Sequence, residues 1–123
     1  MRSTVHFGLL ILRVGVSILM LFHGIPKLLE VIQGNFEFGD PIGLGPVISK
    51  IGAVIGEAIC PILIIIGVRT RLATIPTIIT MAVAAFIVHG SDPIQRKELA
   101  LLYLVAFVAI ALTGAGKYSI DRK

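Results

Sequence analysis

The chain has 123 residues, of which 56% are hydrophobic and 15% are charged, whereas about 25% of an ordinary soluble domain is charged. Its mean hydropathy is +0.99, and a soluble core of this length cannot bury so much apolar surface. These values argue against a water-soluble enzyme, a nucleic-acid-binding module and a disordered tail. The excess of Lys and Arg, 11 against 7 acidic residues, fits one side of a membrane better than a DNA partner.

Four apolar stretches follow one another along the chain, and each is long enough to cross a bilayer as a helix. A transmembrane helix needs about 17–25 residues, and an open sheet cannot sit in lipid. We therefore predict an all-α, membrane-embedded, antiparallel four-helix bundle that forms a single domain over residues 1–123. The expected spans are 7–25, 47–68, 72–88 and 99–116.

The connections between these stretches differ in length. Pro26 disfavours a helix that continues through Ile25, so we expect the first helix to end there and KLLEVI, 27–32, to form a separate interfacial turn or short helix. The Gly- and Pro-rich stretch that follows is expected to be irregular. Loops 69–71 and 90–97 are short, which indicates antiparallel neighbouring helices.

Basic residues in the loops predict the orientation. The positive-inside rule places the side with more Lys and Arg in the cytoplasm. With four spans, six basic residues share the side of the termini and four lie on the other side. We predict cytoplasmic termini, in the cytoplasmic membrane of a bacterium or archaeon. The six are Arg2, Arg69, Arg71, Lys117, Arg122 and Lys123; the four are Lys27, Lys50, Arg96 and Lys97.

Two charged residues fall deep within the predicted spans. An ionisable group there costs about 2.5–3.5 kcal/mol and usually has a partner or a function. Arg13 lies roughly 9 Å and Glu57 roughly 16 Å from the cytoplasmic edge, at 1.5 Å per residue. An arginine side chain can span that difference, so we expect an Arg13–Glu57 ion pair. The pair is either a structural bridge between helices or a polar site that binds a head group or relays protons.

A second polar group is predicted at the opposite ends of the helices. His23, His89 and Glu98 fall at one level, and Lys27 lies one turn beyond His23. Imidazole and carboxylate groups hydrogen-bond quinone oxygens and exchange protons with them. Imidazole also ligates metals and haem, and histidines at a membrane boundary are often only interfacial. The purely interfacial interpretation is favoured for these residues; among possible ligands a quinone is the leading candidate, with haem or metal as the alternative.

Small residues are spaced for close helix packing. Gly52 and Gly56 form a GxxxG step in the second stretch, and Gly8 and Gly15 lie seven apart in the first. Such positions let helix backbones approach closely. They fit a compact bundle and a homo-oligomer equally well.

Several motifs, taken together and in order, resemble those of the DoxX family of small four-helix membrane proteins. The stretch 29–46 departs most from the family pattern. The matching pieces are LLILRVGVSILMLFHGIPKL (9–28), GEAICPILIIIGVRTRLATIP (56–76), FIVHG (86–90) and KELALLYLVAFVAIALTGAGKYSID (97–121).

The resemblance implies an inner-membrane bundle linked to quinone-dependent electron transfer or oxidative-stress complexes, acting with a protein partner. His23, His89 and Glu98 become candidate catalytic residues: the histidines bind or deprotonate a quinol and Glu98 takes the proton. Arg13, Lys27 and Glu57 become candidate cofactor-binding residues. Two other functions stay open, a non-catalytic membrane scaffold or assembly factor and a small-solute carrier.

Overall fold

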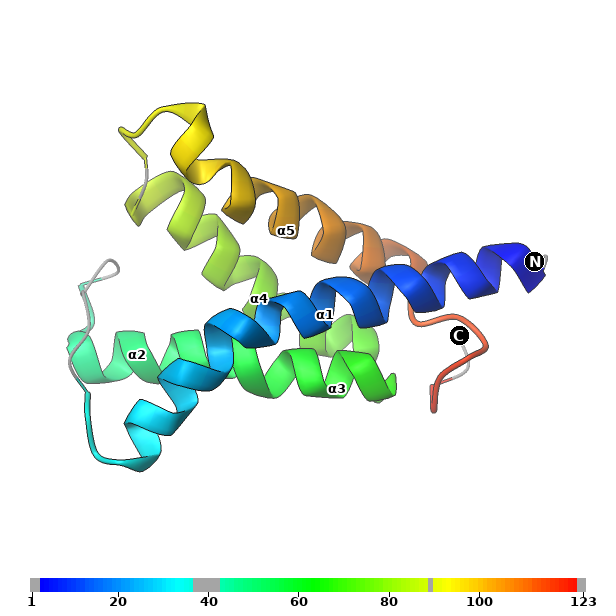
Figure 1. Ribbon diagram of the computed structural model, residues 1–123, viewed down its shortest axis with the longest axis horizontal. Helices are drawn as coiled ribbons and strands as arrows, with labels where there is room; N and C mark the ends of the chain where they lie inside the picture. The colour runs from blue at the N-terminus through cyan, green and yellow to red at the C-terminus, as the bar shows by residue number, and fades with distance from the viewer. Residues whose placement is uncertain (1–2, 37–42, 89, 122–123) are drawn as a thin grey trace.

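The computed structural model in Figure 1 describes residues 3–36, 43–88 and 90–121, together with the side chains of all of them except Arg96. Within these residues every regular element is a helix, which confirms the all-α prediction. The elements are α1 (Ser3–Ile32), α2 (Pro46–Val54), η1 (Ile55–Ile59), α3 (Cys60–Ile66), α4 (Thr70–Val83), η2 (Ala84–Val88) and α5 (Ile94–Thr113).

Four helical segments correspond to the four apolar stretches. The segment α2–η1–α3 is continuous over Pro46–Ile66, and α4–η2 over Thr70–Val88. These two segments and α1 are long and apolar enough to cross a membrane, with 21, 19 and 30 residues. The fourth stretch corresponds to α5, which has 20 residues.

The segments form a ring of four. α1 packs on η1 and α3, these pack on α4, α4 packs on α5, and α5 returns to α1. In the described part of the chain the diagonal pairs, α1 with α4 and α3 with α5, have no close backbone approach, and their side chains share the buried core. Both ends of the described chain lie at one end of the bundle together with the turn between α3 and α4 (Figure 1). We call this the terminal end, and the opposite end, with residues 43–45 and 90–93, the loop end.

Apolar side chains cover the outside of the bundle as well as its core. Leu112, Phe22 and Val105 are 76%, 74% and 67% exposed. Exposed apolar surface on this scale marks a protein that contacts lipid rather than water. The fully buried positions, in contrast, include polar side chains: Arg13, Ser17, Lys50, Thr70, Thr74 and Thr77.

The expected end of the first helix at Ile25 is wrong, because α1 continues through Pro26 to Ile32. Proline interrupts a helix by removing one N–H, but packing against neighbouring helices can hold the helix together in a membrane. Here the turns after Pro26 are tied to the second segment by two ion pairs. Lys27 bonds Glu57, and Glu30 lies 3.4 Å from the buried Lys50 Nζ.

The second segment is widened into a π-helix at Ile55–Ile59, and Pro61 explains why. In a π-helix each carbonyl accepts from the residue five positions later, as Cys60 N–H does to Ile55 O. The next carbonyl, Gly56 O, faces Pro61, which has no N–H to donate. Thr77 Oγ1 of α4 donates to Gly56 O instead, at 2.6 Å. The π-turn is therefore fixed to α4 by a side chain, and it carries Glu57.

Candidate functional site

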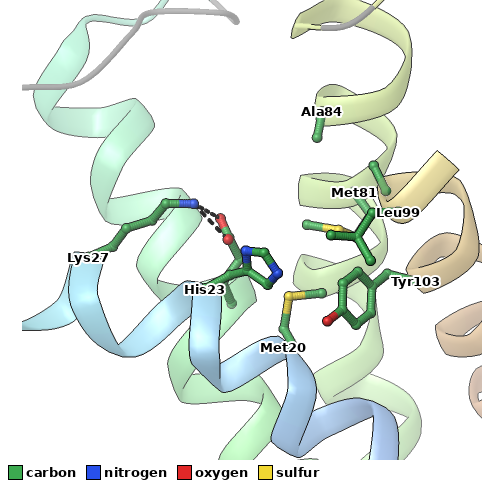
Figure 2. Close-up of a pocket in the computed structure, with 9 residues that line it drawn as sticks. Met20, His23, Lys27, Met81, Ala84, Leu99 and Tyr103 are labelled. Carbon is green, nitrogen blue, oxygen red and sulfur yellow. Dashed lines mark hydrogen bonds and ion pairs between the residues drawn. The ribbon is translucent and has the colours of Figure 1, made fainter. Parts of the chain in front are cut away.

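A cavity of about 230 Å³ lies between α1, η1, α4 and α5 toward the loop end. Figure 2 shows side chains from α1, α4 and α5 turned toward one space. Pockets for drug-sized ligands are usually about 300–1,000 Å³, mostly apolar, with a few polar groups, so this one suits a ring-sized head group. Its apolar lining residues are Met20, Met81, Ala84, Leu99 and Ala100, and its polar ones are His23, Lys27, Glu57 and Tyr103.

One face of α1 builds a wall of the cavity. Met20, His23 and Lys27 are spaced at i, i+3 and i+7, which places them on the same side of a helix. Gly24, next to His23, is buried against η1, where a Cβ would overlap the backbone carbonyl of Glu57. Only glycine permits this close approach, and it brings the two polar side chains of α1 beside Glu57.

Lys27 and Glu57 form an ion pair at the edge of the cavity. Lys27 Nζ donates to both carboxylate oxygens, at 2.7 Å to Oε1 and 2.9 Å to Oε2 (Figure 2). The Glu57 side chain is 6% exposed and that of Lys27 is 30% exposed. Each charge offsets the cost of placing the other in an apolar segment, and the less buried lysine leaves the pair open on one side.

His23 and Tyr103 form the second polar pair. Their ring centroids are 5.9 Å apart and the rings meet edge to face at 84°. Neither the imidazole nor the phenolic hydroxyl hydrogen-bonds another described residue. The cavity therefore presents two groups able to hydrogen-bond a ligand.

The predicted cluster of His23, His89 and Glu98 is only partly brought together. His23 lines the cavity, whereas His89 lies outside the described residues. Glu98 is exposed at the start of α5, and the lining residues that α5 contributes are Leu99, Ala100 and Tyr103. Across residues 3–36, 43–88 and 90–121, no three His, Cys, Asp or Glu side chains gather as a metal site would need.

The expected Arg13–Glu57 ion pair is wrong. The Arg13 side chain is buried at the terminal end, where Nη1 donates to Ile64 O at 2.7 Å and to Ile65 O. Nη2 donates to Tyr118 O at 2.6 Å. The carbonyls at the end of α3 have no further helical N–H to bind, so they outcompete a distant carboxylate. Arg13 thus lies outside the cavity, and Glu57 takes Lys27 as its partner.

The segment Gly114–Asp121 crosses the terminal end and completes the surroundings of Arg13. Asp121 N–H donates to Gly67 O at 2.8 Å, and the Asp121 carboxylate accepts from the N–H groups of Arg69 and Thr70 at 2.9 and 2.8 Å. The carboxylate therefore caps the start of α4, where helix N–H groups lack partners. We call Arg13, Gly67, Thr70, Tyr118 and Asp121 the terminal clamp.

The sequence patterns missed Tyr103, Met20 and Met81 in the cavity and Asp121 in the terminal clamp. Tyr103 carried a usable signal, because its hydroxyl is the one polar side-chain group in the stretch 99–112. The methionines carried none, since they read as ordinary apolar helix residues. Asp121 lies beyond the last apolar stretch, where charge is unremarkable.

Comparison of the chain with known proteins finds one family and two similar proteins. The DoxX family matches residues 8–90, a range that includes His23, Lys27 and Glu57 but not Tyr103. A Haemophilus influenzae protein described as uncharacterized is 35% identical over 95% of this chain and 90% of its own length. Another from the same organism, also described as uncharacterized, is 33% identical over 73% of this chain and 62% of its own length. No solved structure matches the chain.

Proposed function

This chain belongs to the DoxX family, and on that premise we propose that it is a membrane subunit that binds a quinone or quinol head group in the cavity at the loop end. One observation carries the proposal. A ring-sized, mostly apolar cavity presents an imidazole and a phenolic hydroxyl, both without a partner among the described residues, beside an ion pair.

The chemistry of the lining suits a flat apolar ring with oxygen atoms at its edge. Met20, Met81 and Leu99 supply apolar contact for the ring. His23 and Tyr103 each offer an N–H or O–H donor to a ring oxygen. Neither donor has a partner among the described residues, so a ligand that supplies an acceptor gains a hydrogen bond to each.

A bound quinone supplies two-electron, two-proton redox chemistry. In the proposed role His23 holds or accepts the proton at a ring oxygen, since an imidazole nitrogen can donate or accept a hydrogen bond. The Glu57 carboxylate, paired with Lys27, is a second proton acceptor at the edge of the cavity. The electrons pass to or from a redox centre on a partner protein, which makes this chain an accessory subunit.

The same proposal includes the placement in the membrane. We propose that α5 crosses the bilayer with the other three segments as an antiparallel bundle, with the termini in the cytoplasm of a bacterium or archaeon. The position of both described ends at one end of the bundle supports an even number of crossings (Figure 1). The cavity then opens toward the non-cytoplasmic side.

Binding of a short-chain ubiquinone analogue and of menadione to the purified full chain in lipid nanodiscs tests the proposal by isothermal titration calorimetry. We expect saturable binding of at least one of them. His23→Gln and Tyr103→Phe should each weaken it about 3–10-fold, the effect of one lost hydrogen bond.

The terminal end offers matched controls for both variants. His6→Gln and Tyr118→Phe change the same residue types far from the cavity, and neither should alter the affinity. Binding that is absent in the wild type, or equally weakened in the four variants, would overturn the proposal and leave a scaffold role as the better account.

A further inference from the structure

The interior of the bundle contains a second polar region, which extends from Arg13 and Thr70 of the terminal clamp toward the cavity. Arg13 and Ser17 lie one turn apart on the inner face of α1, and Thr70, Thr74 and Thr77 follow the same spacing on α4. All five side chains are buried. α1 and α4 are diagonal members of the ring, and both contribute side chains to its buried core.

Some of these groups are satisfied by the protein and some are not. The Thr74 hydroxyl donates to Arg71 O at 2.6 Å, and that of Thr77 to Gly56 O at 2.6 Å. In contrast, Arg13 Nε, Ser17 Oγ and Thr70 Oγ1 are buried and hydrogen-bond no described residue. In a membrane protein, bulk water does not reach such atoms, and each costs free energy until a partner is found.

The three unsatisfied atoms belong to one region. Arg13 and Ser17 are one helical turn apart, and the Arg13 guanidinium lies against the turn that leads into Thr70, since a Cβ on Gly67 would be 3.3 Å from Nη1. The same C-terminal segment also holds both Arg13 and Thr70: Nη2 donates to Tyr118 O, and Thr70 N–H donates to the Asp121 carboxylate.

We propose that these three atoms bind an internal water molecule at the centre of the bundle. Buried waters typically make about three hydrogen bonds to otherwise unsatisfied groups. Arg13 Nε–H can only donate, whereas the two hydroxyls can also accept, so one water can accept from Arg13 and donate to Ser17 and Thr70. The water site is separate from the cavity and does not depend on its ligand.

A small anion is the competing occupant, because an arginine and two hydroxyls can all donate. The charge of Arg13 is already opposed by the Asp121 carboxylate, which acts electrostatically on it. A neutral ligand that both accepts and donates therefore fits the site better than chloride.

A double-mutant cycle on the full chain in nanodiscs tests the water site. Ser17→Ala and Thr70→Val should each lower the midpoint of thermal unfolding by about 3–6 °C, the shift that follows from losing one satisfied hydrogen-bond partner in a chain of this size. The double variant should fall no further than the lower single variant, because either change already releases the water. Thr4→Val and Ser91→Ala, which change exposed hydroxyls, are the matched controls.

Four results would overturn the proposal. Single variants whose midpoints rise or stay unchanged would mean that the hydroxyls have no partner to lose. If the two substitutions lower the midpoint by amounts that add in the double variant, Ser17 and Thr70 do not share one ligand. A midpoint that rises with chloride but not with gluconate would identify an anion. Solid-state NMR transfer from water to Arg13 Nε–H, present in the wild type and lost in the double variant, completes the expected pattern, and its absence in the wild type also contradicts it.

Discussion

The two ends of the bundle both bury charged side chains, but they satisfy them differently. At the terminal end, Arg13 donates to backbone carbonyls of α3 and of the C-terminal segment, which cannot move without unfolding the helix end. At the loop end, Lys27 and Glu57 satisfy each other beside an open cavity. A side chain bonded to backbone is structural, whereas a side-chain pair at a cavity can exchange partners with a ligand. The terminal end is therefore expected to stabilise the fold, and the loop end is where the proposed binding would take place.

The largest loss of unfolding free energy is expected for a substitution at the terminal end. Arg13→Met leaves three carbonyl groups without their donor and should lower the free energy of unfolding by roughly 3–5 kcal/mol. Arg13→Lys should recover only part of this, because one ammonium cannot reproduce the planar fork of donors. Thermal unfolding in mild detergent measures both. A destabilisation below that of the loop-end variants would reverse the comparison.

A substitution that disturbs the packing of α1 on η1 at the loop end should give the next largest loss of unfolding free energy. Gly24→Ala forces a methyl group onto the Glu57 backbone carbonyl, and overpacking of this kind costs about 1–3 kcal/mol. Gly15→Ala is the matched control on the same helix, because a Cβ there meets no atom within 4 Å. Gly24→Ala should also weaken ligand binding in the cavity. Equal stability of the two variants would show that α1 and η1 are not in close contact.

The ion pair at the loop end should matter less for stability than Arg13 does. Lys27→Gln and Glu57→Gln should each lower the free energy of unfolding by about 1–2 kcal/mol, since an amide keeps part of the hydrogen bonding. Their double-mutant cycle should give a coupling of at least about 0.5 kcal/mol. A sharper contrast lies in the binding assay, where these two variants should lose affinity and a folded Arg13→Lys should not.

The smallest effect is expected for the cap on α4. Asp121→Asn keeps one of the two acceptor oxygens that bond the N–H groups of Arg69 and Thr70. It also removes the negative charge at a helix N-terminus, which is worth about 0.3–1 kcal/mol. The measured loss of unfolding free energy should shrink further in high salt if the carboxylate is partly solvated. A loss as large as that of Arg13→Met would mean that Asp121, not Arg13, holds the terminal clamp.

Sequence patterns predicted the helices better than they predicted the contacts. Hydrophobic length located all four segments, because a bilayer requires about 20 apolar residues whatever their neighbours are. The helix beyond Pro26 was missed, since its stability comes from ion pairs with the second segment rather than from local preference. Local rules about proline are overridden when tertiary partners are available.

The polar residues themselves were predictable, but their pairing was not. The free-energy cost of an ionisable group in a membrane span correctly indicated that Arg13 and Glu57 each have a partner. The partners of Arg13 are carbonyl oxygens, which every residue carries, so no side-chain pattern could reveal them. Lys27 is only one turn beyond His23, and its bond to Glu57 depends on Gly24 and the π-turn at Ile55–Ile59. Both features depend on backbone geometry, which the spacing of side chains along the sequence does not reveal.

The acceptors of Arg13 all follow it in the chain, so its contacts form in a fixed order relative to synthesis. Its first acceptor is 51 positions further along the chain and its last is 105 positions away. Because a chain is synthesised from its N-terminus, Arg13 is made before all of these acceptors. Its guanidinium can therefore gain its last partner only after Tyr118 has been translated.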